Sequence, residues 1–255
     1  MHNNKMLGVS TENKLTNNRN LPCPCGSGKK YEKCCLNRGL GVGNLILSEE
    51  LKGMLDTPCW YHGSDQKFNK WEIPPPEKPN EPLLVAHTAL FFTSNLSYAE
   101  KAGKNIAGSS LSSKAKILDT TANYDACEKL RIEFSKHPVA SRTYNANHDF
   151  WHEGWRTGHV LRMAYNDPAM EIHLQQMAHD LTEQTGLPLE ATLVIIQHNS
   201  SRGLIELICN SAQKLGFDAL YGHEVDRHSD ANKVIAQPIL AVLSKGIMSE
   251  PDWVA

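Results

Sequence analysis

Four cysteines lie close together within residues 23–35, in the order C-x-C-x8-C-C. Thiolate sulfur is a preferred ligand of zinc, and a structural zinc site needs four donors at the corners of a tetrahedron. Gly26 and Gly28 let the chain turn sharply between the two cysteine pairs. Because so short a segment cannot bury a core, we expect the metal to supply its folding energy. The spacing predicts a zinc site formed by Cys23, Cys25, Cys34 and Cys35.

Three further blocks combine polar and aromatic residues of the kinds that bind cofactors. They are WYHGS at 60–64, TALFFTS at 88–94 with LSYA at 96–99, and GFDAL at 216–220, which YGHE follows. Each block is weak alone, because a His-Gly pair at a strand end is usually a turn and an aromatic strand is usually core. The blocks suggest a site only if the fold brings them together.

The segment 146–160 is rich in His, Trp and Arg. His148 and His152 are four residues apart and would share a helix face, which a second metal could use. Their order is not H-E-x-x-H, so we expect a hydrogen-bonded helical pair instead. An aromatic and basic surface that stacks nucleic-acid bases is another interpretation, although core packing of the tryptophans is the expected one; the residues concerned are Trp151, Trp155, Arg156 and Arg162.

The composition is that of an ordinary soluble globular protein, with 255 residues and a formal net charge of -2. This charge gives no global reason to expect a nucleic-acid partner. No apolar run reaches the roughly 18 residues that a transmembrane helix requires, and the N-terminus does not resemble a secretory signal. We therefore expect a cytoplasmic protein with reduced thiols, in which Cys59, Cys127 and Cys209 are buried and unreactive.

The elements that must position these residues follow from hydrophobic spacing. We expect a flexible leader at 1–21, the cysteine motif at 22–36, a helical linker at 37–58 and a mixed α+β domain at 59–250. Within the domain, strands are predicted for CWYHGS, LLVAHTALFFTS, AKILDTT, FDALY and KVIAQPILAVL, the last with Pro238 limiting its pairing. Helices are predicted at 96–103, 123–136, 146–184 with a break near 166–168, and 203–215, while 192–199 is open between strand and helix.

The cysteine segment CPCGSGKKYEKCC resembles the SEC-C motif, which ends the SecA motor ATPase and occurs in many unrelated bacterial proteins. In that family the motif binds zinc and docks on partners, notably the SecB chaperone. The resemblance implies Zn²⁺ as a cofactor and a SecB-like chaperone or the ribosome as a partner.

Taken together, in this order and spacing, the three blocks resemble the ADP-ribosyltransferase fold, in the branch whose first motif starts with His. The resemblance spans about residues 59–243 and includes AKILDTT as the strand after the short helix. It implies an α+β fold with a split mixed β-sheet core and a helical insertion, here preceded by a small zinc knuckle.

The resemblance also implies NAD⁺ as the substrate. Loss of nicotinamide from NAD⁺ develops oxocarbenium charge, as in glycoside hydrolysis, and a nearby carboxylate stabilises that charge. His62 would bind the adenosine ribose, Gly63 would let the backbone approach the nicotinamide, and Phe91 or Phe92 would stack on it. The implied NAD pocket consists of Tyr61, His62, Gly63, Ser64, Phe91, Phe92, Thr93, Ser97 and Tyr98, and the implied catalytic residues are His62, Phe91 and Glu224.

The acidic catalytic residue is open on the sequence alone. Alignment on the last strand, KVIAQP, puts the usual Glu position at or near Asn232. The available carboxylates are Glu224, Asp226 and Asp230, of which we choose Glu224.

We therefore expect a mono-ADP-ribosyltransferase toxin of the toxin–antitoxin or phage-defence type. It would transfer ADP-ribose from NAD⁺ to RNA, DNA or protein, with nucleic acid slightly favoured. An antitoxin would be a further partner, and no membrane would be involved. The alternatives are a non-catalytic interaction protein that docks through the zinc knuckle, and an NAD glycohydrolase that uses the same pocket with water as acceptor.

Overall fold

The computed structural model describes residue 30 and residues 45–76, 83–137, 148–161, 168–226 and 235–254. The chain divides into two compact units, 1–44 and 45–255. The four cysteines of the predicted zinc site belong to the first unit and lie outside the described residues, as does the predicted leader. The helices and strands that the structure describes belong to the second unit.

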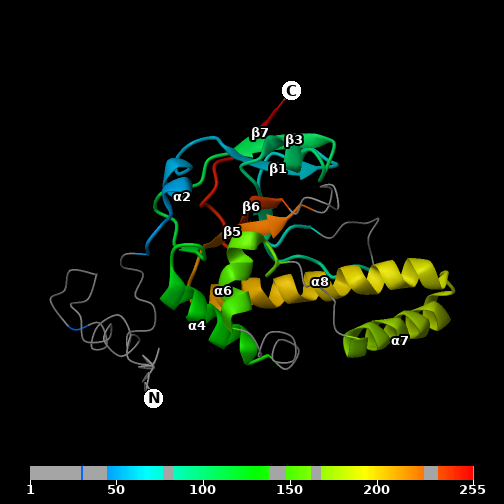
Figure 1. The fold of residues 1–255 in the computed structure, drawn as a ribbon. Helices are drawn as coiled ribbons and strands as arrows, with labels where there is room; N and C mark the ends of the chain where they lie inside the picture. The colour runs from blue at the N-terminus through cyan, green and yellow to red at the C-terminus, as the bar shows by residue number, and fades with distance from the viewer. Residues whose placement is uncertain are drawn as a thin grey trace, which may run out of the picture. The chain divides into compact units, whose positions relative to one another are not determined.

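Two β-sheets form the centre of this unit, which is a mixed α+β structure (Figure 1). One sheet has the antiparallel order β1-β3-β7, with strands Trp60–Ser64, Asn105–Ser109 and Asp252–Trp253. The other has the order β2-β6-β5-β4, with strands Leu90–Phe92, Ala236–Val242, Ala219–Val225 and Ile117–Asp119. Only β4 and β5 are parallel within these two sheets.

The two sheets meet where the chain leaves β2. Thr93 and Tyr61 exchange both backbone hydrogen bonds, at 2.8 and 3.0 Å. The segment after β2 thus leaves the four-stranded sheet and joins β1 of the other sheet. It continues into the short helix α3, Leu96–Ala99, which Asn95 caps through a side-chain bond to the backbone N–H of Tyr98.

The main core lies between the sheets. Successive side chains of a strand point to opposite faces, and β2, β5 and β6 each supply alternate residues to this core. Its fully or largely buried members include Leu51, Trp60, Leu90, Phe92, Leu111, Ile117, Tyr221, Leu240 and Val242. Leu51 belongs to helix α2, Glu49–Gly53, so residues 45–58 form part of this unit.

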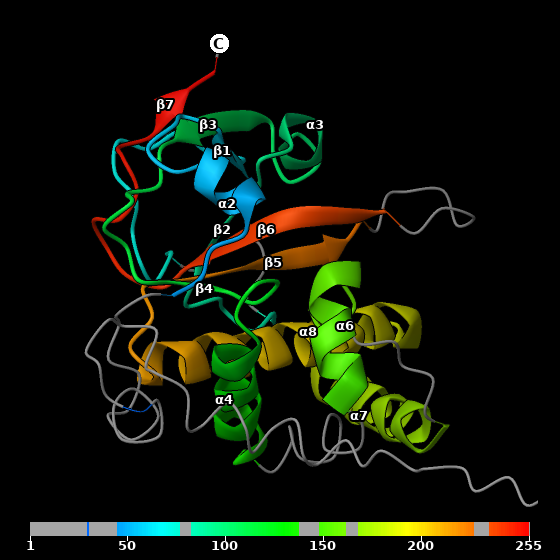
Figure 2. The ribbon, with the colours of Figure 1, turned by 60° about the vertical axis from the view of Figure 1, so that its left-hand side comes forward.

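Helices cover the opposite face of the four-stranded sheet (Figure 2). They are α4, Tyr124–Ser135; α6, His148–Thr157; and α8, Leu189–Lys214. Helix α7, Pro168–Thr185, packs along α8 as an antiparallel partner. No helix in the described ranges combines the length and the apolar character that a membrane crossing requires.

Most predicted elements are present, but two differ in an informative way. The open segment 192–199 is helical and lies inside α8, whose continuation carries the predicted helix 203–215. The strand predicted for KVIAQPILAVL is β6, which has neighbours on both sides. Pro238 is tolerated there because its nitrogen points away from β5, towards a side on which β2 pairs only with Leu240–Val242.

Candidate functional site

His62 of the first block reaches the backbone of the second block. Its Nδ1 lies 2.8 Å from the carbonyl oxygen of Phe91. A carbonyl can only accept, so Nδ1 carries the proton and Nε2 of the neutral ring is an acceptor. The ring packs against Trp71 and Phe92, with centroid distances of 5.4 and 5.5 Å.

Gly63 is required by packing between β1 and α3. A Cβ atom at this position would lie 2.2 Å from the carbonyl oxygen of Ala99 and 3.0 Å from the nitrogen of Gly103. The resemblance implied that this glycine lets the backbone approach the nicotinamide, and the structure adds a local packing role. It lets the helix approach the strand end that contains His62 and Ser64.

The second block contacts strand β6 through a series of hydrogen-bonded polar side chains. Asn95 donates from Nδ2 to Oε1 of Gln237 at 2.7 Å, and Thr93 accepts through Oγ1 from the backbone N–H of Asn95 at 3.1 Å. Thr93 and Gln237 are buried. Sequence reasoning missed Gln237; the one available signal is a polar residue alternating with apolar ones within AQPILAV. Beyond it on α3, Ser97 is exposed and Tyr98 half-buried.

Phe91 and Phe92 point to opposite faces of the sheet. Phe92 joins His62 in the aromatic group between the sheets, while the Phe91 ring lies on the helical face, 5.1 Å from the ring of His87. There Phe91 lines a cavity of about 240 Å³ that Glu224 of β5 also lines. The other lining residues are His87, Leu161, His198, Ser201, Arg202 and Ile205.

The structure therefore brings Phe91 and Glu224 together and keeps the His62 ring on the other face. Phe91 connects the two places, because its carbonyl accepts from His62 and its ring lines the cavity. Glu224 and Gln237 are paired residues of neighbouring strands. Of the other acidic candidates, Asp226 is buried and lies 2.9 Å from Nζ of Lys101, and Asp230 and the Asn232 position lie outside the described residues.

A buried carboxylate stands behind this cavity. Glu206 of α8 is 7% exposed and accepts hydrogen bonds from Nδ1 of His87 and the backbone N–H of Thr88, each at 2.9 Å, and from the Thr88 hydroxyl. Burial opposes its ionisation, but these bonds prevail and hold the pKa of Glu206 below its usual value. Sequence reasoning missed His87, Arg202 and Glu206; a charged residue among the apolar positions of GLIELICN is the visible signal.

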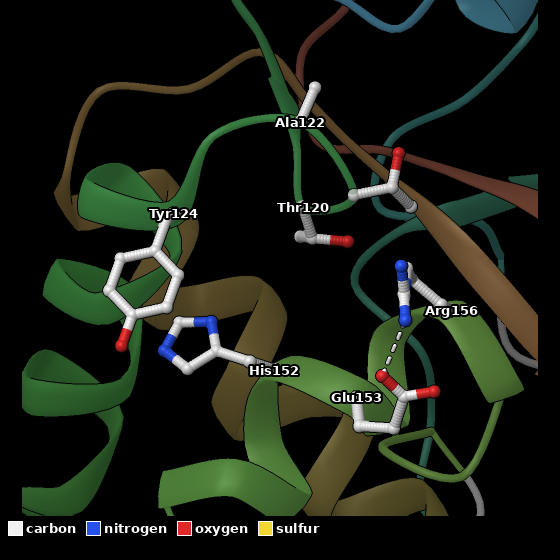
Figure 3. A pocket seen from close by; sticks show the side chains of 7 residues that line it. Thr120, Ala122, Tyr124, His152, Glu153 and Arg156 are labelled. Carbon is white, nitrogen blue, oxygen red and sulfur yellow. Dashed lines mark hydrogen bonds and ion pairs between the residues drawn. The ribbon is translucent and has the colours of Figure 1, made fainter.

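A second cavity, of about 400 Å³, lies between the loop after β4 and helix α6 (Figure 3). The rings of Tyr124 and His152 stack on one side of it, 4.0 Å apart and 15° from parallel. Glu153 and Arg156, 2.7 Å apart, form the other side. Its remaining lining residues are Thr120, Thr121 and Ala122.

The segment 146–160 forms no base-stacking surface from its tryptophans. Trp151 and Trp155 are fully buried, and Nε1 of Trp151 donates to the carbonyl of Cys127 at 3.1 Å. Nε2 of His152 lies 3.2 Å from Oε2 of Glu128, and no group of three metal-binding side chains occurs among the residues the structure describes. The side chains of His148 and Arg162 lie outside that part of the chain.

The scattered cysteines agree only partly with expectation. Cys127 and Cys209 are buried, and burial raises the pKa of Cys127 to about 12 and that of Cys209 further. Cys59 is half-buried and exchanges a hydrogen bond with the Thr57 hydroxyl at 3.0 Å.

Comparison with known proteins assigns a family to the cysteine segment alone. Residues 19–37 match the SEC-C motif. Short stretches are similar to the uncharacterized protein YccF of Bacillus subtilis (50% identity over 34 residues, 13% of this chain and 10% of that protein) and to protein translocase subunit SecA 1 of Rhodopirellula baltica (75% over 20 residues, 8% and 2%). A third is the UPF0225 protein plu2503 of Photorhabdus laumondii (88% over 17 residues, 7% and 11%).

The chain thus spans about a tenth or less of each of these relatives. No solved structure matches.

Proposed function

We propose that residues 45–255 bind NAD⁺ and transfer its ADP-ribose group to a cellular macromolecule, as the resemblance of the three blocks to ADP-ribosyltransferases suggests. The observation that carries the proposal is the double role of Phe91. Its backbone carbonyl accepts a hydrogen bond from His62 of the His-Gly-Ser strand, and its ring lines the same cavity as Glu224. An aromatic face for nicotinamide and an acidic group for the ribose are the two features that this chemistry needs.

The charges around the cavity support an anionic dinucleotide as ligand. Arg202 and His198 line it together with Glu224, so donors for phosphate lie beside the carboxylate. At about 240 Å³ the cavity is smaller than the roughly 300–1,000 Å³ of most small-molecule sites. It would hold the reacting end of NAD⁺ and leave the rest outside.

In this proposal Glu224 stabilises the charge that develops as nicotinamide leaves, and Phe91 stacks on the departing ring. His62 acts through Phe91, because its bond to the carbonyl fixes the strand that presents the ring. The SEC-C segment recruits a partner, and its four cysteine thiols are a donor set that suits tetrahedral Zn²⁺.

The test is NAD⁺ consumption by the full-length protein with labelled NAD⁺ and a bacterial lysate. Label on a macromolecule is the expected result, and release by nuclease or protease treatment identifies RNA, DNA or protein as the target. Glu224→Gln should lower transfer about 100-fold or more. The matched control is Glu190→Gln, the same change at an exposed position in the first turn of α8. Equal loss in both variants, or no NAD⁺ turnover by the wild type, contradicts the proposal.

One observation favours a second candidate, a domain that binds partners without catalysis. Strand β6 brings a polar side chain to the second block, and this side chain is the uncharged amide of Gln237, bonded to Asn95. The resemblance would require a carboxylate for catalysis. NAD⁺ binding without turnover would support this candidate. Turnover to free ADP-ribose alone would instead identify an NAD glycohydrolase.

A further inference from the structure

We infer that His87, positioned by Glu206, is the base that takes the proton of the acceptor in the cavity lined by Phe91 and Glu224. This inference rests on the proposed function and adds to it the residue that activates the incoming nucleophile.

The first step is the pairing of His87 with a buried acid. Glu206 is 7% exposed, and its Oε1 lies 2.9 Å from Nδ1 of His87. Thr88 donates twice to the same carboxylate, from its backbone N–H and its hydroxyl. Three donors around one buried carboxylate keep it ionised at neutral pH, which agrees with its lowered pKa.

The second step is the tautomer that this pairing imposes. An ionised carboxylate only accepts, so Nδ1 of His87 carries a proton, and Nε2 of the neutral ring is left with a lone pair. The ring lines the cavity and meets the Phe91 ring at 5.1 Å. A proton taken up at Nε2 creates an imidazolium, which the Glu206 carboxylate stabilises in place.

The chemical step then balances. A hydroxyl or amine of the acceptor forms a bond to C1′ of the nicotinamide ribose, the bond from C1′ to the nicotinamide nitrogen breaks, and its electron pair leaves with neutral nicotinamide. The acceptor's proton passes to Nε2 of His87 and afterwards to solvent. Glu206 does not touch the reactants and is a positioning residue.

Several charged groups face His87 and bear on its pH dependence. Glu206, His198 and Arg202 approach from α8, and Glu224 approaches from β5. Thr88 already connects the segment before β2 to α8 through two hydrogen bonds to Glu206. Holding these two segments together therefore does not require His87, whereas His87 adds a proton acceptor to the cavity wall.

The experiment measures nicotinamide release from NAD⁺, with water or with azide as acceptor, across pH 5–8. Azide is an anionic nucleophile and has no proton to lose. His87→Asn keeps a donor near the Nδ1 position for Glu206 and removes Nε2. With water, we expect this variant to be at least about 100-fold slower than wild type and to lose the rise in rate with pH. Azide should restore about 10-fold or more of the lost rate in His87→Asn and little in Glu224→Gln, which lacks the charge-stabilising group.

Glu206→Gln provides the second variant. Without its carboxylate partner the imidazolium that forms in the step is less stabilised, so the rate with water should fall about 10-fold, while the rate with azide, which needs no base, should stay within about 2-fold of wild type. Thr88→Val is the structural control, because it removes one bond to Glu206 and should lower the melting temperature without changing the ratio of the water rate to the azide rate.

A folded His87→Asn protein with wild-type rate and pH profile overturns the inference, as does an equal loss of rate with water and with azide in Glu206→Gln. In either case the proposed function stands if the wild type still consumes NAD⁺. A wild type that releases no nicotinamide with either acceptor overturns both.

Discussion

Glu206, Asp226 and Glu224 differ in their burial and in their partners, and this difference gives them different roles. Glu206 is buried and satisfied by three hydrogen bonds. Asp226 is 5% exposed and pairs with Lys101 at 2.9 Å. Glu224 is half-buried and lines the cavity. Of the three, Glu224 is the one that lines the cavity, and it is therefore the reactive carboxylate in our proposal.

Stability measurements separate these two candidates. Asp226→Asn removes one partner of an ion pair whose acid is buried, which should lower the free energy of unfolding by about 1–3 kcal/mol. Glu224→Gln should change it by less than about 1 kcal/mol, because a half-buried group on a cavity wall loses little on becoming neutral. Urea unfolding followed by circular dichroism compares the two. A larger loss in Glu224→Gln would assign the structural role to Glu224 instead.

Glu206 makes the stability of the protein depend on pH. Its pKa is lower folded than its ordinary value of 4.5, so the stabilisation is fully present above about pH 4.5 and is lost as the pH falls through the lower folded-state pKa. Glu206→Gln should therefore be less stable than wild type by about 1.5–3 kcal/mol at pH 7. The difference should shrink as the pH falls from 4.5 towards 3. Thermal unfolding at several pH values checks this, and a difference that stays constant down to pH 3 would contradict it.

At the residue scale, the sequence indicated which blocks come together but not towards which face of the sheet their side chains point. The blocks that contain His62 and Phe91 do come together, yet the two rings lie on opposite faces of β2. Which of two adjacent phenylalanines faces the helices depends on how β2 is registered against β6, and a shift of one residue would exchange them. The sequence did not reveal three residues of the site, because the hydrogen-bond partner of each lies far away along the chain. They are Gln237, whose partner is Asn95, and His87 and Glu206, which are partners of each other.

At the scale of elements, most helices and strands were predicted, whereas β3, β7 and the first half of α8 were not. Helix α4 follows its predicted range 123–136 closely. Strands β3 and β7 were not predicted, because NIAGS shows no alternation of polar and apolar residues and DW is too short to show one. They are strands because β3 pairs with β1 and β7 pairs with β3. Pro238 suggested an edge strand, and only the early end of β2 explains its central place.

The contact between β1 and α3 yields a prediction about Gly63. Gly63→Ala would place a methyl group 2.2 Å from the backbone oxygen of Ala99, which cannot move without shifting the helix. We expect a loss of about 1–3 kcal/mol or more in the absence of any ligand. Gly203→Ala in α8 meets nothing within 4 Å and should stabilise by about 0.5–1 kcal/mol.

Differential scanning calorimetry of the two variants without NAD⁺ tests the local role of this glycine. A Gly63→Ala protein with wild-type stability that fails only to bind NAD⁺ would restore the ligand-approach role that the sequence suggested. A Gly203→Ala protein as unstable as Gly63→Ala would show that both glycines are held by contacts of another kind.

At the scale of the whole molecule, the chain combines two units with different sources of stability. Residues 45–255 bury a core between two sheets and a second apolar cluster between α7 and α8. The SEC-C segment, residues 19–37, is too short for such a core, so we infer that a metal takes its place there. Because the stabilising forces differ, removal of one should leave the other unit folded.

Cys34→Ser tests this independence. A serine hydroxyl is a poor substitute for a thiolate ligand, so the variant should lose its zinc. The melting temperature of the main unit should stay within about 2 °C of wild type, because none of the buried residues of its core changes. Cys59→Ser is the matched control, since Cys59 is half-buried, lies in the other unit and should leave one zinc per chain. Metal content by elemental analysis and unfolding by circular dichroism give the two readouts. Full zinc retention in Cys34→Ser would refute this ligand, and unfolding of the main unit on zinc loss would mean that the two units fold together.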